Sequence, residues 1–187
     1  DGDLDLFTAN GHVQIGIEQT QDGIYYREPS HLFLNDGSGH FTDIVPIIGG
    51  ALSKTIVGRG AAYADYDKNG TVDILVTENG GPAHLYRNDN HLNNFLRINI
   101  KSINGTRDGL GTKLVGIINN MSMERRVKTG SSFMSHSETT VTFGLGNAEK
   151  LDSLYIYWPD GTKEIFNNIN GGQEINIIEG QGRLAVQ

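Results

Sequence analysis

The sequence contains the same acidic motif twice, and this repetition constrains the fold more than any other feature. Residues 1–6 read DGDLDL and residues 69–74 read NGTVDI, so an acid or amide, a glycine and apolar residues fall at matching positions. A second motif follows each copy, as HLFLNDGSGHF at 31–41 and HLYRNDNHLNNF at 84–95. Each unit is an acidic loop, an apolar strand, an Asn-Gly turn, an insertion and a His-Leu-aromatic strand. A repeat of roughly 50–70 residues made of short strands is typical of a propeller blade.

The pattern changes near Asn93, where we place a domain boundary. In FLRINIK at 95–101, apolar residues alternate with Arg97, Asn99 and Lys101, which predicts a half-buried strand with these three on its polar face. Similar strands are predicted at 112–118, 124–129, 139–145, 153–158, 163–166 and 173–179. The Pro-Asp-Gly turn in WPDGT predicts a hairpin over 153–166.

These patterns predict an all-β fold. We expect about one and a half propeller-type blades over residues 1–92, a β-sandwich of roughly seven strands over 93–180, and a C-terminal tail over 181–187. The nearest helical candidates, 46–56 and 145–153, are short. Two blades cannot close a ring, so these sheets should have exposed edges, and we expect them to be covered by the sandwich or by another copy of the chain through self-association.

Composition limits the function. The chain has 25 Gly and 4 Pro in 187 residues, which favours many tight turns over Pro-rich linkers. A formal net charge of −7 disfavours nucleic acids and anionic membranes as partners and favours cations. There is no Cys, so disulfides and thiolate metal sites are excluded. No apolar run reaches the roughly 18 residues of a membrane span.

The segment DYDKNGTVD at 65–73 has the chemistry of a calcium loop. Oxygen-bearing side chains fall at alternate positions, Asp65, Asp67 and Asn69, and Asp73 follows. Ca²⁺ binds six to eight oxygens at about 2.3–2.6 Å, and a loop curled around one point can supply them. The backbone carbonyl of Thr71 can add another ligand. Three carboxylates packed together would repel one another without a cation, and this repulsion is an argument for a metal.

Other interpretations of this segment are open. A solvated Asp/Asn-Gly turn would need no ion. An EF-hand or dockerin-type loop would need a ligand at its twelfth position, which is Val76, and a flanking helix, whereas the flanks GRGAAYA and ILVT are strand-like. Magnesium is disfavoured relative to calcium because many protein oxygens suit the larger ion.

Several residues could suggest catalysis or a different ligand. Histidines stand at 12, 31, 40, 84, 91 and 136 without an HExxH motif, and His31 and His84 occupy equivalent repeat positions, which favours a structural role. Serines surround His136, but no G-x-S-x-G elbow is present. Carboxylates that could pair as glycosidase acids are Asp108, Asp152, Asp160 and Glu164. Tyr155, Tyr157 and Trp158 could offer a sugar-binding face or pack in the sandwich.

Several motifs together carry a family resemblance. RGAAYADYDKNGTVDILVTENGGPAHLYRND at 59–89 resembles the FG-GAP/VCBS-type repeat, although Gly60-Ala61-Ala62 stands where the signature has Phe-Gly and Gly-Ala-Pro, so the repeat is divergent. A second set of motifs within residues 107–161 resembles the ASPIC/UnbV domain, namely RDGLGTKL, GSSFMSH, VTFGLG and LYIYWPDG. That domain typically follows such repeats in secreted bacterial proteins and in proteins of the cartilage acidic protein type.

The resemblance implies a calcium-stabilised, non-catalytic extracellular module. Its calcium ligands would be Asp65, Asp67, Asn69, Thr71 and Asp73. In the first copy, Asp1, Asp3 and Asp5 would be the back half of a second loop, which we expect to bind Ca²⁺ weakly or not at all.

The first copy also bears on the extent of the protein. Two acids should precede Asp1 in a complete loop, so we expect the chain to be the C-terminal part of a longer repeat protein that is secreted, periplasmic or on the cell surface. Its function would be adhesion or binding of a protein or glycan; the alternative is a carbohydrate-binding accessory domain of a polysaccharide-degrading system.

Overall fold

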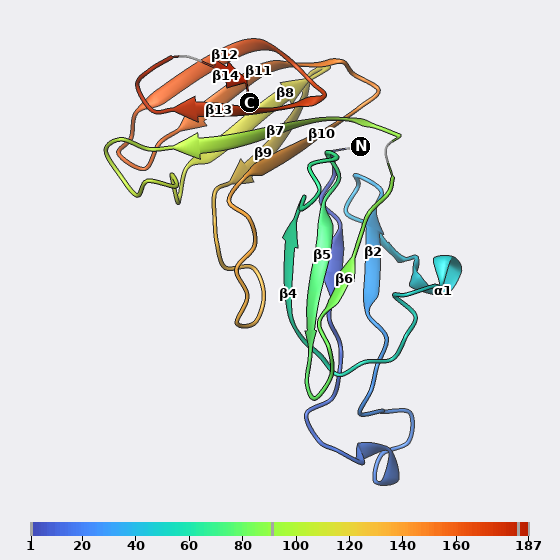
Figure 1. Ribbon diagram of the computed structural model, residues 1–187. Coiled ribbons are helices and arrows are strands. Elements are labelled where there is room, and N and C mark those ends of the chain that lie inside the picture. The colour runs from blue at the N-terminus through green and yellow to red at the C-terminus, as the bar shows by residue number, and fades with distance from the viewer. Residues whose placement is uncertain (1, 91, 183, 187) are drawn as a thin grey trace.

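The computed structural model describes residues 2–90, 92–182 and 184–186. Its regular structure is almost entirely β, so the predicted all-β fold is confirmed (Figure 1). The described helices are short, the 3₁₀ turn η1 (Ile17–Gln19) and α1 (Val45–Ile48). Within the described residues, none is long and apolar enough to cross a membrane.

The repeat region forms two three-stranded antiparallel sheets with strand orders β1-β2-β3 and β4-β5-β6. The first contains β1 (Leu6–Thr8), β2 (His31–Asn35) and β3 (Phe41–Asp43). The second contains β4 (Gly58–Ala64), β5 (Asp73–Glu78) and β6 (His84–Tyr86). The two motif copies therefore build equivalent strands, β1 with β5 and β2 with β6. Neither sheet closes on itself, as expected for blade-like units.

The two repeat sheets stack face to face. Phe7 on β1 lies 6.4 Å, centroid to centroid, from Tyr86 on β6. Val76, which lies on the same face of the second sheet as Tyr86, is fully buried. Phe7 in the first copy is equivalent to Leu75 in the second copy. The first sheet contacts the second through the face that carries Phe7, so the corresponding face of the second sheet is the one that carries Leu75. That face carries Leu75 and its partner Leu85 in register.

The second half forms two four-stranded sheets above the repeat region in Figure 1. One has the order β10-β7-β13-β14, and the other has β12-β11-β8-β9. Their strands are β7 (Asn94–Lys101), β8 (Lys113–Ile118), β9 (Met121–Arg126), β10 (Val141–Gly146), β11 (Lys150–Tyr157), β12 (Lys163–Asn170), β13 (Gln173–Ile178) and β14 (Leu184–Val186).

Strand alternation explains the core between these sheets. Leu96, Ile98 and Ile100 of β7 are buried, and β8 and β11 bury alternate residues in the same way. One apolar cluster joins both sheets, with Phe143 fully buried within it. Large aliphatic and aromatic side chains that interdigitate in this way supply most of the favourable free energy of folding.

The structure differs from the sequence-based strands in a few places. β9 begins at Met121, ahead of the predicted 124–129, because Asn119 and Asn120 both have positive φ and close a tight hairpin. β14 lies within the predicted tail 181–187 and pairs with β13. The helical candidate 145–153 is largely the β10–β11 connection and the start of β11. The predicted hairpin at 153–166 is present, with Tyr157 opposite Lys163.

Candidate metal centre

The acidic loop at 65–73 joins β4 to β5 at the end of the second sheet that faces the sandwich (Figure 1). Its turn needs Gly70, which has a φ of +92°. A Cβ at this position would lie 2.0 Å from Cε1 of Phe95 on β7. Glycine therefore allows both the reversal of the chain and the close approach of the sandwich.

Three carboxylates converge in this loop. Asp65, Asp67 and Asp73 each place one oxygen within 4.8 Å of the others, and no other group of three acids or histidines does so in the described part of the chain. Asp65 and Asp73 are buried, whereas Asp67 is exposed. Oxygens bound at about 2.5 Å to one Ca²⁺ lie at most about 5 Å apart, so the three acids fit a shared hard cation.

Backbone amides hold the two buried carboxylates in place. Asp65 accepts hydrogen bonds from the N–H groups of Asn69, at 3.0 Å, and Gly70, at 2.8 Å. Asp73 accepts from Tyr66 N–H at 3.2 Å and from Asn88 N–H at 2.8 Å. These bonds fix the orientation of the carboxylates before any ion binds, as the outer contacts of a metal site do.

The other two predicted ligands are engaged within the loop. The side-chain oxygen of Asn69 accepts hydrogen bonds from the backbone N–H and the hydroxyl of Thr71, at 2.8 and 2.5 Å. The Thr71 hydroxyl also lies 2.5 Å from the carbonyl oxygen of Asn88. The structure thus brings the three aspartates together, and Asn69 and Thr71 form the turn beside them. Their role as ligands stays a prediction.

Arg97 was predicted to lie on the polar face of its strand, but it is only 4% exposed. Its Nε lies 3.3 Å from Asp65, and its guanidinium also contacts Glu138 and Glu174 at 2.7 and 2.9 Å. Burial by itself would lower the pKa of Arg97, but the hydrogen bonds that its guanidinium donates to Glu138 and Glu174 raise the pKa well above its ordinary value, so Arg97 stays charged. The polar face of β7 is therefore covered at Arg97, because the acidic loop packs against it.

The centre has an excess of negative charge. A hollow beside it is lined by Asp65, Lys68, Phe95, Arg97, Gly172, Gln173 and Glu174. Within the described residues, the three loop aspartates, Glu138 and Glu174 outnumber the cations Lys68 and Arg97. Like charges held this close in a partly buried site cost free energy, and a divalent cation would offset that cost.

The first copy repeats part of the same geometry. Asp5 accepts a hydrogen bond from Asn35 N–H at 2.9 Å, just as the equivalent Asp73 accepts from the equivalent Asn88. Asp3 and Asp5 are both exposed. Asp1 lies outside the described residues, so the predicted second site stays a prediction.

The loop also touches a serine-rich segment of the sandwich. Residues 129–138, which we call the serine segment, connect β9 to β10 and run down beside the edge strand β4 (Figure 1). Its Ser132 and Ser137 hydroxyls accept hydrogen bonds from Ala61 and Tyr63 N–H, and Glu138 N–H donates to the Tyr63 carbonyl. The segment therefore supplies partners to an edge that would otherwise be free to pair with another chain.

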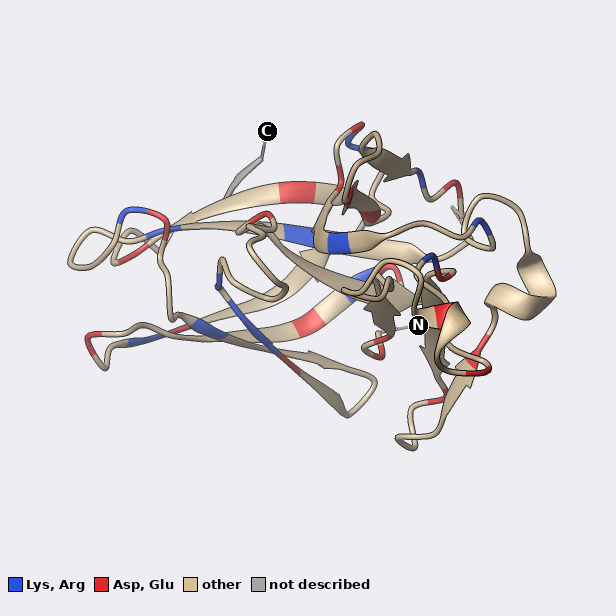
Figure 2. Cartoon of the chain, turned by 90° about the horizontal axis from the view of Figure 1, so that it is seen from below, with Lys and Arg blue, Asp and Glu red and all other residues tan. Residues whose placement is uncertain are grey.

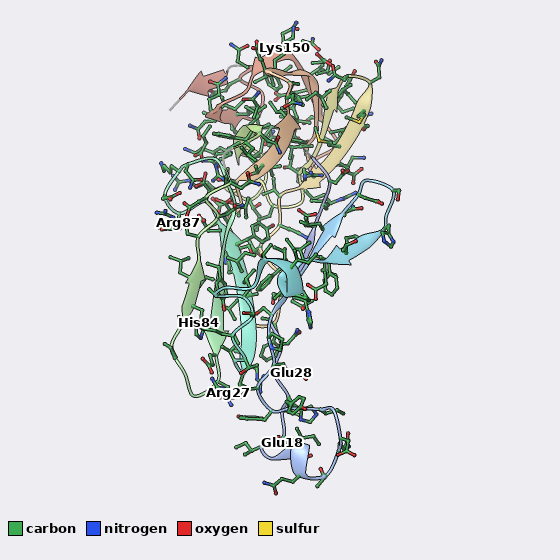
Figure 3. All side chains as sticks on the ribbon, turned by 90° about the vertical axis from the view of Figure 1, so that its right-hand side faces the viewer. Glu18, Arg27, Glu28, His84, Arg87 and Lys150 are labelled. Atoms are coloured by element: carbon green, nitrogen blue, oxygen red, sulfur yellow. The ribbon has the colours of Figure 1, made fainter. Side chains whose placement is uncertain are left out.

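The repeat histidines form a second kind of polar contact. His31 lies 2.6 Å from Asp43, and the equivalent His84 lies 2.8 Å from Glu78, which Arg27 also contacts. Arg27 and His84 lie at the end of the repeat region remote from the sandwich (Figure 3). The hydrogen bond with His84 lowers the pKa of Glu78. These histidines thus have the structural role that the sequence predicted, while His91 lies outside the described residues.

Several aromatic and acidic residues that could suggest sugar binding or catalysis make structural contacts instead. Trp158 is buried in the sandwich core, so it offers no ring to a sugar. The ring of Tyr157 lies between the ammonium groups of Lys113 and Lys163. Asp152 and Glu164 accept hydrogen bonds from backbone N–H groups at Asn119 and Gly180, and Asp160 does so within its own turn. Acidic and basic residues are interspersed over the sandwich strands (Figure 2).

Sequence reasoning missed Arg97 and Glu138. Arg97 alternates with buried aliphatic residues, which is the pattern of a solvent-facing position, and Glu138 sits in a polar loop. A signal did exist, because Glu138 is the acid that ends the Ser-rich run GSSFMSHSE. Only the packing of the loop against β7 shows that the two residues meet.

Comparisons with known proteins agree with this organisation. Residues 1–76 match the family model of the FG-GAP-like repeat, and residues 102–184 match that of ASPIC and UnbV. Human cartilage acidic protein 1 is 29% identical over 139 residues. That alignment covers 70% of this chain and 20% of the human protein, so the chain spans about a fifth of this relative. The chain thus matches an FG-GAP-like repeat in its first part and an ASPIC and UnbV model in its second part, in the order that its motifs predicted.

Proposed function

We propose that this chain is a non-catalytic, calcium-stabilised module of an extracellular or cell-surface protein, and that it serves in ligand binding or adhesion. FG-GAP-like repeats are generally calcium-binding and typical of such proteins. The observation that carries the proposal is the convergence of Asp65, Asp67 and Asp73 within 4.8 Å. Ca²⁺ would join the two ends of the loop between β4 and β5, so its binding energy would stabilise the fold.

A non-catalytic role is supported by the hydrogen bonds that several candidate catalytic side chains make within the fold. The hydroxyls of Ser132 and Ser137 accept hydrogen bonds from the edge of β4. Asp152 and Glu164 hold backbone N–H groups. Each of these side chains therefore has a structural partner in the fold, which is consistent with a non-catalytic role.

Calcium titration by isothermal calorimetry tests the metal. We expect one site with a Kd of roughly 10⁻⁴–10⁻³ M, the range of extracellular modules, and weaker binding of Mg²⁺. Asp67→Ala should abolish binding without unfolding the chain, since Asp67 is exposed and holds no backbone group of the loop. Asp22→Ala, which removes an exposed acid from another loop, is the matched control and should bind normally. Absence of calcium binding by the unmodified chain would refute the metal.

We propose a second copy of the chain as one partner. Leu75 and Leu85 are 43% and 52% exposed and lie side by side on the second sheet. Phe7, the equivalent of Leu75, packs on the next sheet through Tyr86. The exposed face of the second sheet, with Leu75 and Leu85, is therefore equivalent to the face of the first sheet that already contacts another sheet. The first sheet exposes Leu6 on its opposite face, which a second copy could contact. Such a head-to-tail contact is heterologous and could extend.

Sedimentation velocity over a range of concentrations checks this partner. We expect association that weakens in Leu85→Glu, whereas Leu92→Glu, at another exposed leucine outside the sheet, should associate normally. A chain that stays monomeric up to high micromolar concentration, or association that Leu85→Glu leaves unchanged, would contradict it.

A further inference from the structure

We propose that Glu138 is a positioning residue of the calcium site, supplied by the sandwich, and that calcium in turn fastens the serine segment to β4. This inference rests on the proposed calcium binding. It concerns a residue outside the acidic loop that reaches the loop by two routes, one through the backbone of Asp65 and one through Arg97.

The first route is direct. An oxygen of Glu138 accepts a hydrogen bond from the backbone N–H of Asp65 at 3.3 Å. Asp65 is the first acid of the loop, and its carboxylate already orders the other end of the turn through Gly70 N–H. Glu138 therefore fixes the backbone from which the first ligand projects. Contacts of this kind set the direction of a ligand without touching the ion.

The second route runs through Arg97. Two nitrogens of its guanidinium contact the carboxylate of Glu138, at 3.0 and 2.7 Å, while Nε lies 3.3 Å from Asp65. A two-point pair between guanidinium and carboxylate has a fixed geometry. Glu138 therefore binds the two terminal nitrogens of Arg97 and leaves only Nε to contact Asp65. Arg97 then does not form a two-point pair with the Asp65 carboxylate. Without Glu138, Arg97 would compete more strongly with Ca²⁺ for Asp65.

The serine segment keeps Glu138 in this position. Its own N–H donates to the Tyr63 carbonyl at 3.0 Å, and Ser137 accepts from Tyr63 N–H at 3.2 Å. Tyr63 lies on β4, two residues ahead of Asp65. The backbone N–H of Glu138 thus holds the serine segment to β4, and the side chain of the same residue holds the backbone of Asp65. Calcium and the segment must then stabilise each other equally, because binding linkage is reciprocal.

Calcium affinity of Glu138 variants tests the proposal. Loss of an outer-shell partner typically weakens metal binding 10–100-fold, so we expect Glu138→Ala to raise the Kd for Ca²⁺ by about 10-fold. Glu138→Gln keeps an acceptor for Asp65 N–H and should recover most of that loss. Glu124→Ala, which removes an acid from an exposed ion pair with Arg126 on β9, is the control for loss of charge and should bind as the unmodified chain does.

The titrations separate the alternatives. A Glu138→Ala variant that binds Ca²⁺ normally overturns the proposal, and equal weakening in Glu138→Gln and Glu138→Ala also overturns it, since net charge alone would then explain the effect. If the unmodified chain binds no Ca²⁺, the proposed function fails as well, and this is visible before any Glu138 variant is measured.

Hydrogen exchange gives an independent readout that needs no folded variant. In the unmodified chain, saturating Ca²⁺ should slow exchange of the Glu138 amide, which donates to Tyr63, by about 10-fold, matching the affinity change. The amide of Met123, paired with Gly116 inside the sandwich, serves as the reference for global stabilisation. Slowing confined to residues 65–73, with Glu138 unchanged relative to the reference, would overturn the proposal while leaving calcium binding intact.

Discussion

Substitution of Gly70 by alanine should destabilise the contact between the acidic loop and the sandwich. Gly70 has a φ of +92°, and a Cβ there would lie 2.0 to 2.3 Å from three atoms of the Phe95 ring. Phe95 is half-buried at the start of β7 and lines the hollow beside Asp65, so its ring would have to shift to admit a Cβ. The substitution therefore combines backbone strain with a steric clash.

Each contribution has its own magnitude. A left-handed conformation costs a residue with a Cβ about 1–2 kcal/mol. Forcing extra volume into a packed site costs about 1–3 kcal/mol more. We therefore expect Gly70→Ala to lower the free energy of unfolding by about 2–5 kcal/mol. Gly80→Ala should cost only the backbone part, because Gly80 has a φ of +71° and nothing within 4 Å of its Cβ position.

Urea unfolding of a double-mutant cycle measures the clash separately. In a Phe95→Ala background, Gly70→Ala should cost about 1–2 kcal/mol, because only the backbone strain remains. The difference between the two backgrounds reports the steric part. Equal costs of Gly70→Ala in the two backgrounds, or a cost no larger than that of Gly80→Ala, would refute the reasoning.

Three further perturbations follow from the structure. Arg97→Met should cost about 3–5 kcal/mol in urea unfolding because it removes the cation that pairs with the buried Asp65 and with the partly buried Glu138 and Glu174, and a cost below about 1 kcal/mol would contradict the network. Glu78→Gln should reduce the loss of stability that acid causes. The hydrogen bond with His84 lowers the pKa of the Glu78 carboxyl in the folded state, so its stabilisation is present above about pH 4.3 and is lost as the pH falls further. Urea unfolding at a series of pH values would measure this difference. Gly116→Ala should cost about 1–3 kcal/mol, since its Cβ would lie 2.9 Å from Phe143 in the core; an unchanged melting curve would count against that packing.

The sequence was sufficient for the parts of the fold that local patterns control. Alternation placed most sandwich strands, and the Pro-Asp-Gly turn placed the hairpin at 153–166. The repeated motif placed β1 and β5 as equivalent strands, and the acidic spacing brought Asp65, Asp67 and Asp73 together. Each of these features depends on residues close to one another in the chain.

What could not be predicted depends on contacts between distant segments. Alternation marked Arg97 as solvent-facing, because nothing in β7 itself shows that the acidic loop will cover that face. The serine segment could be recognised as a loop, but its hydrogen bonds to β4 require the sandwich to sit above the repeat region. The strand β14 is too short to show a periodicity of its own.

Thermal unfolding with and without calcium tests the central claim most directly. At 10 mM Ca²⁺ and a Kd of roughly 10⁻⁴–10⁻³ M, binding to the folded state should add about 1.4–2.7 kcal/mol. For a chain of this size that raises Tm by about 3–10 °C relative to EDTA. The rise should be absent in Asp67→Ala and present in Asp22→Ala. Superimposable melting curves of the unmodified chain in EDTA and in 10 mM Ca²⁺ would contradict a calcium-stabilised module.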